Sequence, residues 1–112
     1  MVRDSASLAV IDFQDTVTGP LTYDVASLLK DCYFKLNNSE RDELLKLSYQ
    51  MYVEQGLCQS DFSQFKYWFD FMALQRHLKV CGIFSRLYLR DGKSAYLNDL
   101  PLVVDYIIDV CR

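Results

Sequence analysis

The chain has 112 residues, with 12 basic and 15 acidic side chains and a formal net charge of −3. A chain that is 51% hydrophobic and 24% charged is not intrinsically disordered, and this length fits one domain or part of a larger one. A sequence pI near 5.0 argues against nucleic-acid binding. The sequence also lacks a long apolar run and the apolar core of a signal peptide, so we expect no membrane contact and a cytoplasmic protein.

A short β segment over residues 7–13 is predicted at the start, because this run is apolar, rich in β-branched residues and closed by an acid. The residues before it are too few for more than one short hairpin partner. Gly19 and Pro20 then interrupt the chain, and the pattern beyond them is helical. The first helix is predicted over residues 22–36, with Thr22 as its N-cap.

The second helix is predicted to begin at residues 39–42, where the sequence S-x-x-D has the form of a capping box. Gly56 is its predicted C-terminal stop. Its apolar residues recur at helical spacing, and they predict an inward face made of Leu44, Leu47, Met51 and Tyr52.

A long third helix is predicted from Ser60 or Asp61 to about Arg90, with a kink near Gly82 because nearly 30 residues is long for a globular helix. Residues 91–93 form the next turn. The aromatic side chains at the start of this helix are predicted to be core rather than a ligand platform; they are Phe62, Phe65, Trp68 and Phe69.

The last helix is predicted to follow Asp99 as its cap, with Pro101 tolerated in the first turn. Its predicted apolar side consists of Val103, Val104, Ile107, Ile108 and Cys111. The expected fold class is therefore mainly α with a short β segment at the N-terminus. A lone strand leaves backbone groups unpaired, so the chain resembles a helical piece that follows something else. A complete small helical domain with an extended arm is the alternative.

The cysteines give no sign of a metal site. Cys32, Cys58, Cys81 and Cys111 are separated by 26, 23 and 30 residues, so no close ligand pair exists. We expect reduced and mostly buried thiols. The single histidine, His77, is expected to be packed or hydrogen-bonded rather than catalytic.

The most informative motif is IDFQD at residues 11–15. A carboxylate fixed at the end of a buried strand suits a hard cation such as Mg²⁺, and phosphoryl transfer uses a carboxylate of this kind. The alternative is that Asp12 and Asp15 only form the turn after the strand.

The motifs IDFQD at residues 11–15 and YDVASLL at residues 23–29 resemble the aminoglycoside phosphotransferase and choline kinase superfamily. Three further stretches are similar to one branch of it, the bacterial kinases that phosphorylate N-acetylmuramate and N-acetylglucosamine at the anomeric hydroxyl. These stretches are QRHLKV at 75–80, GIFSRL at 82–87 and RDGK at 90–93. The resemblance extends from Leu8 to about Tyr106 and implies the helical C-terminal lobe of a protein-kinase-like fold.

The resemblance implies a role for two aspartates. Asp12 matches the magnesium-binding aspartate of the family, with Gln14 where the family has glycine. Asp24 matches a buried aspartate that braces the backbone of the catalytic loop; a helix-start carboxylate favoured by the helix dipole is the alternative. The family's glycine-rich loop, strand lysine and His-x-Asp loop are missing from these residues, so we expect the 112-residue chain alone to be inactive.

Four basic residues, Arg76, Lys79, Arg86 and Arg90, fall within roughly an 80° sector of one helix face. In a kinase, Arg76, Arg86 and Arg90 would contact substrate or phosphate oxygens. The alternative is that these residues form a solvated face or pair with acids such as Glu54, Asp61 and Asp70. Within this alternative, we favour ion pairs for Arg76 and Arg86.

Residues 1–112 are thus interpreted as the C-terminal helical lobe of a sugar kinase that uses ATP and Mg²⁺ in cell-wall recycling. A non-catalytic helical interaction module is the alternative from another class, and an aminoglycoside or choline-like acceptor is the alternative substrate. An exposed lobe interface also predicts self-association.

Overall fold

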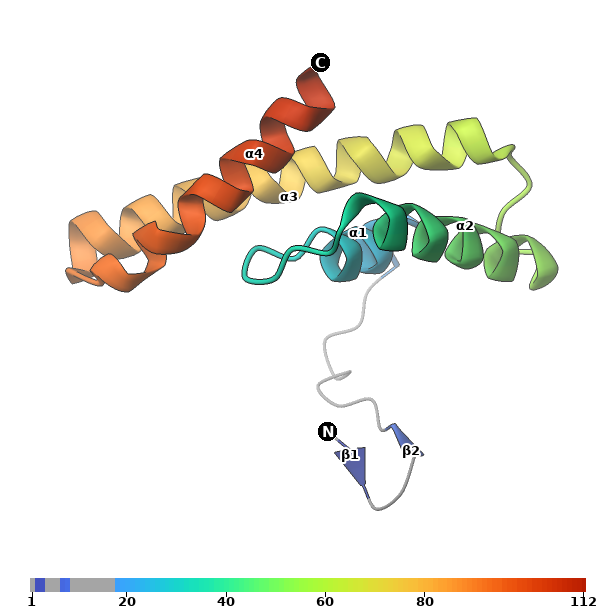
Figure 1. The fold of residues 1–112 in the computed structure, drawn as a ribbon, viewed down its shortest axis with the longest axis horizontal. Helices are drawn as coiled ribbons and strands as arrows, with labels where there is room; N and C mark the ends of the chain where they lie inside the picture. Colours follow the sequence, from blue (N-terminus) through green and yellow to red (C-terminus); the bar gives the residue numbers. More distant parts are fainter. Residues whose placement is uncertain (1, 4–6, 9–17) are drawn as a thin grey trace.

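The computed structural model describes residues 2–3, 7–8 and 18–112. Two short strands and a set of helices make up these residues (Figure 1). In chain order they are β1 (Val2–Arg3), β2 (Ser7–Leu8), α1 (Tyr23–Leu29), α2 (Asn38–Glu54), α3 (Phe62–Asp91), the 3₁₀ helix η1 (Ser94–Asp99) and α4 (Leu100–Cys111). The predicted mainly helical class is confirmed.

The two strands form an antiparallel pair, with Val2 opposite Leu8 and Arg3 opposite Ser7. The predicted short hairpin partner is thus confirmed as β1. The predicted β segment is confirmed at Ser7–Leu8, and its remainder, which includes Asp12, lies outside the described residues.

Helix α3 is the element around which the other helices pack. It contacts α1, α2, η1 and α4, and α1 also contacts α2. Helices α1 and α2 lie along one side of α3, while α4 folds back across it after the turn at η1 (Figure 1). Among the described residues, no helix is long and apolar enough to cross a membrane.

The core is built where α1, α2 and the first half of α3 meet. Its buried members are Val25, Ala26, Leu29, Leu45, Cys58, Phe65, Phe69 and Ala73. The prediction that Phe65 and Phe69 are core is confirmed, whereas Trp68 is 39% exposed. A second buried group follows along α3 and α4, and it consists of His77, Phe84, Val103 and Tyr106.

Helix α1 ends at Leu29, so the prediction of a helix to residue 36 is wrong. The Asp31 carboxylate accepts hydrogen bonds from the backbone N–H groups of Tyr33 (2.7 Å) and Phe34 (3.0 Å). An aspartate that binds backbone N–H groups two and three residues ahead replaces the helical hydrogen bonds with a turn. Periodicity in residues 22–36 did not reveal this competing interaction.

The cap of α2 is Asn37 rather than Ser39. The Asn37 side chain accepts from the backbone N–H of Glu40 (2.9 Å), and the Glu40 carboxylate accepts from the backbone N–H of Asn37 (3.3 Å). This reciprocal pair is a capping box, two residues earlier than predicted.

The inward face of α2 also differs from the prediction. Leu45 is 1% exposed, whereas Leu47 is 51% and Met51 is 50% exposed. Tyr49 and Tyr52 pack against the core beside Leu45, so the prediction is confirmed for Tyr52. The helix is therefore rotated by about one residue relative to the predicted face, and an apolar stripe remains on its outer side.

Helix α3 begins after Asp61, whose side chain accepts from the backbone N–H of Gln64 (2.8 Å), as predicted. It continues as one helix through Gly82 to Asp91, as the pattern predicted. A glycine inside a helix costs about 1 kcal/mol without breaking it, and η1 and α4 pack along this part of α3. Gly56 and Gly92, with φ of 70° and 65°, end α2 and α3 as predicted.

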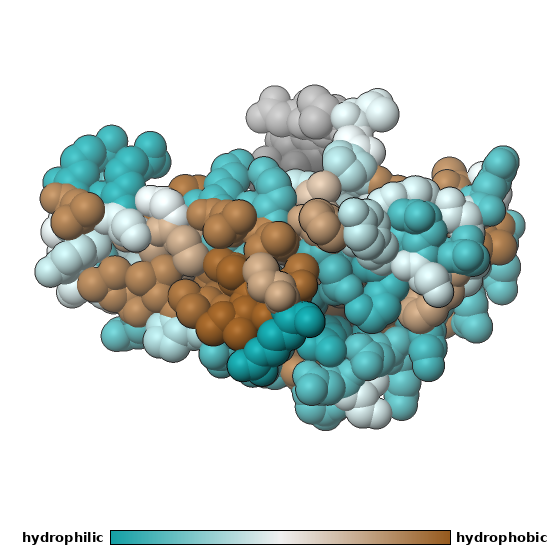
Figure 2. Space-filling view, turned by 90° about the horizontal axis from the view of Figure 1, so that it is seen from above, coloured by the Kyte–Doolittle hydropathy of each residue, from teal (hydrophilic) through white to brown (hydrophobic). Residues whose placement is uncertain are grey.

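The final helix buries less of its apolar side than predicted. Val103 is buried, but Val104 and Ile108 are each 42% exposed and Cys111 is exposed. Tyr106, which was not predicted to face inward, is 1% exposed. Asp105 and Asp109 mark a polar side of α4, and the apolar side is wide, so the pattern did not decide which part of it faces inward. Figure 2, which views the molecule from the α4 side, shows apolar side chains gathered there. All four cysteines are free, as predicted, although only Cys58 is buried.

Candidate functional site

The two aspartates singled out from the sequence have different outcomes. Asp12 lies outside the described residues, so its surroundings are not described. Asp24 lies in the first turn of α1, and its side chain is exposed. In the described part of the chain, Asp24 thus does not have the buried setting expected for it.

Arg76 lies close to the start of α1. Its guanidinium carbon is 4.5 Å from the centroid of the Tyr23 ring, a cation–π contact, and the side chain is half-buried. Among the described residues, neither Arg76 nor Arg86 forms an ion pair, so the pairing with Glu54, Asp61 or Asp70 is not found, and the exposed Arg86 fits the alternative of a solvated face. Tyr23 instead occupies one face of the Arg76 guanidinium.

The other two arginines are remote from Asp24. Arg86 and Arg90 follow Arg76 by 10 and 14 residues, which places them about 15 and 21 Å further along the helix axis. Both are exposed, and Arg90 forms a bidentate pair with Asp91 at 2.7 and 3.1 Å. The four basic residues therefore share one face of α3, but only Arg76 among the three arginines lies near the start of α1.

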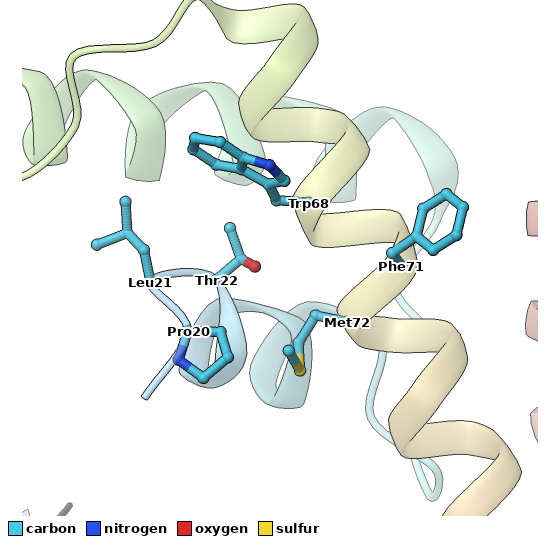
Figure 3. Close-up of a pocket in the computed structure, with 6 residues that line it drawn as sticks. All are labelled: Pro20, Leu21, Thr22, Trp68, Phe71 and Met72. Atoms are coloured by element: carbon cyan, nitrogen blue, oxygen red, sulfur yellow. The ribbon is translucent and has the colours of Figure 1, made fainter. Parts of the chain in front are cut away.

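A hollow of about 420 Å³ lies between the start of α1 and α3. Figure 3 shows Trp68 and Met72 on the side of α3 that faces the segment before α1. The residues lining the hollow are Pro20, Leu21, Thr22, Trp68, Phe71 and Met72. The described part of this lining is almost entirely apolar, and Pro20, Leu21 and Thr22 follow in sequence on the segment that carries Asp12.

A buried charge, not predicted from the sequence, lies at the other end of α1. Lys30 is 6% exposed, and its ammonium is 3.0 Å from the Asp70 carboxylate and 5.2 Å from the Phe69 ring centroid. Burial lowers the pKa of Lys30, while Asp70 opposes this shift. Lys66 binds the second oxygen of Asp70. The only sequence signal for Lys30 was its position four residues after the inward-facing Ala26.

His77 joins this cluster to α4. The ring is 3% exposed, and it stacks on Tyr106 with a centroid distance of 4.9 Å and an interplanar angle of 10°. Nε2 lies 2.9 Å from the carbonyl oxygen of Lys30, which can only accept, so Nε2 carries the proton. The prediction that His77 is packed and hydrogen-bonded is confirmed. Burial, together with the charges of Lys30 and Arg76, lowers the pKa of His77.

We expect the free energy of unfolding to fall as the pH is lowered below about 6.5. In that range His77 binds a proton in the unfolded chain but stays neutral in the folded chain, so protonation favours unfolding. The free energy of unfolding therefore decreases until the pH falls below the lowered pKa of His77 in the folded chain. The slope is at most about 1.4 kcal/mol per pH unit. Urea unfolding between pH 8 and pH 5 measures it. His77→Gln, which keeps a donor for the Lys30 carbonyl, should flatten the curve, and an unchanged slope would contradict the assignment.

The described residues supply no metal site of their own. No group of three or more histidine, cysteine, aspartate or glutamate side chains among them is arranged to hold a metal ion. A magnesium site therefore depends on Asp12 and on ligands outside the part of the chain that the structure describes.

Comparison with known proteins confirms the resemblance noted in the sequence. Residues 1–54 match the phosphotransferase enzyme family. The chain is 40% identical over 104 residues to an N-acetylmuramate/N-acetylglucosamine kinase of Neisseria meningitidis serogroup B, which covers 92% of this chain. It is 38% identical over 111 residues to a protein of the same name from Pseudomonas putida, which covers 98% of this chain. The chain is thus related to the phosphotransferase enzyme family.

The similarity covers only part of each relative. The chain spans 31% of the Neisseria kinase and 33% of the Pseudomonas putida kinase, about one third of the length of these curated relatives. A kinase of the same name from Caulobacter vibrioides is 30% identical over 110 residues. No solved structure matches the chain significantly.

Proposed function

We propose that residues 1–112 form the C-terminal helical lobe of an ATP-dependent kinase that phosphorylates N-acetylmuramate or N-acetylglucosamine in the cytoplasm during cell-wall recycling. The supporting observation is 38–40% identity with kinases of these sugars over at least 92% of the chain. The protein-kinase-like fold belongs to the same proposal, and the helical packing of α1–α4 is compatible with such a lobe.

In this proposal the carboxylate of Asp12 holds the divalent cation that neutralises charge on the nucleotide phosphates. Asp24, exposed at the start of α1, accepts hydrogen bonds from the backbone of a catalytic loop contributed by the rest of the enzyme. Of the three arginines, Arg86 is the best candidate for a phosphate or sugar contact. It is exposed and has no recorded ion pair among the described residues, whereas Arg76 stacks on Tyr23 and Arg90 pairs with Asp91.

A graft tests the proposed function. Residues 1–112 replace the matching third of the Pseudomonas putida kinase, and ATP-dependent phosphorylation of N-acetylmuramate and N-acetylglucosamine is measured, with kanamycin and choline as alternative acceptors. We expect transfer to the two amino sugars, and no transfer by the 112-residue chain alone. A folded graft that consumes ATP only with kanamycin or choline would contradict the proposed substrate. A folded graft without any transfer would favour a non-catalytic module.

A further inference from the structure

An exposed aromatic surface extends from the hollow between the start of α1 and α3 onto the side of α3 that is turned away from the segment before α1, where Phe71 contacts Tyr67 (Figure 3). We call it the Trp68 surface, and it consists of Leu21, Tyr67, Trp68, Phe71 and Met72. Trp68, Phe71 and Tyr67 are 39, 53 and 55% exposed, and the Tyr67 and Phe71 rings lie 4.5 Å apart. Clustered exposed aromatic side chains with methionine are typical of the centres of protein interfaces. Such a surface is costly to leave in water.

The chemistry of the lining argues against a sugar as its occupant. Among the described residues that line the hollow, Thr22 and the indole N–H of Trp68 provide the only side-chain polar groups, and Thr22 is itself 1% exposed. An amino sugar carries several hydroxyl groups that each need a hydrogen-bond partner when they leave water. An apolar protein segment needs none of these partners, so it fits the hollow better.

A second apolar hollow, beside α2, is a weaker candidate for the same purpose. Its lining combines the carboxylates of Glu40 and Glu43 with the apolar side chains of Phe34, Leu36, Leu44 and Leu47. Two negative charges in its lining favour hydration, and covering them would require cationic partners. In the part of the chain that the structure describes, no acidic side chain lines the hollow at Trp68.

We propose that the Trp68 surface is where the remaining part of the kinase polypeptide docks onto this lobe. This inference rests on the proposed function, because about two thirds of each related kinase is not represented in the chain. The hollow is lined by Pro20, Leu21 and Thr22, so the segment that carries Asp12 leads directly to it in sequence.

The test compares the same substitutions in two settings, the 112-residue chain and the graft in the Pseudomonas putida kinase. Trp68→Ser and Phe71→Ser should lower the melting temperature of the isolated chain by less than about 4 °C, because both side chains are substantially exposed there. In the graft each should lower it by about 5–10 °C, because a covered aromatic side chain is lost. Leu89→Ser, at the 81% exposed Leu89 near the other end of α3, is the matched control and should have little effect in either setting.

Each other result overturns the inference in a specific way. Equal shifts in both settings would show that no further segment covers the surface. A melting temperature of the isolated chain that rises with its concentration, and loses this dependence in Trp68→Ser, would assign the surface to self-association. Quenching of the single tryptophan, Trp68, by N-acetylglucosamine in the isolated chain would make the hollow a sugar site. Because melting temperature does not depend on phosphoryl transfer, an inactive graft with the expected shifts contradicts only the proposed function.

Discussion

We expect Asp12→Ala to lower kcat of the graft by a factor of about a hundred to a thousand or more. Removing one preorganised group that stabilises transition-state charge typically costs this much, and phosphoryl transfer depends on charge neutralisation more than on covalent chemistry by the protein. The measurement is initial rate against N-acetylmuramate at saturating ATP and Mg²⁺. A kcat within tenfold of the parent graft would refute the proposed role of Asp12.

The neighbouring acid provides the control for this experiment. Asp15 belongs to the same IDFQD motif, carries the same charge and is three residues away in sequence. If Asp12 and Asp15 both serve only as turn formers, Asp15→Ala and Asp12→Ala should have similar effects on kcat and on melting temperature. A large loss of kcat confined to Asp12→Ala, with both melting temperatures unchanged, separates a catalytic carboxylate from a structural one.

Local signals in the sequence predicted the elements and their ends well where a single residue decides the outcome. Asp61 caps α3, and Gly56 and Gly92 end helices because positive φ is accessible to glycine at low cost. The signals failed where two local interactions compete. Asp31 replaces helical hydrogen bonds with a turn, and Asn37 takes the capping position from Ser39.

Helical faces were harder to predict because they depend on where partner helices lie. Leu44, Leu47 and Met51 form a regular apolar stripe, yet α2 packs through Leu45 and Tyr49 instead. The stripe on the outer side is compatible with a lobe that has a further partner, but periodicity cannot distinguish a core face from an interface face.

The candidate site was also hard to predict, because the sequence pattern does not show which residues of different elements meet in space. The arginine stripe was correctly placed on one face of α3, but a shared face does not imply a shared site when residues are about 15 Å apart along the axis. The Lys30–Asp70 pair was missed because its members are 40 residues apart, and nothing local marks their contact. By contrast, the motifs at residues 11–15, 23–29 and 75–93 were sufficient to reveal the similarity to the phosphotransferase enzyme family that the comparisons support.

We expect Phe69→Ala to destabilise the 112-residue chain by about 3–5 kcal/mol. The Phe69 side chain is 1% exposed in the core between α1, α2 and α3, so its removal loses apolar burial and leaves a cavity. It also removes the ring beneath the buried ammonium of Lys30, 5.2 Å from the ring centroid, and exposes that charge to a less favourable environment. Urea unfolding monitored by circular dichroism measures the difference.

Phe71→Ala is the matched control, since it makes the same change two residues later on the same helix. Phe71 is 53% exposed and loses mainly its contact with Tyr67, so the expected cost is no more than about 1 kcal/mol. If Phe69→Ala does not fold, Phe69→Leu keeps the core largely filled and should still cost more than Phe71→Ala. Similar costs at positions 69 and 71 would mean that α3 does not present Phe69 to the core, and the packing of α1 and α2 against this face would then be wrong.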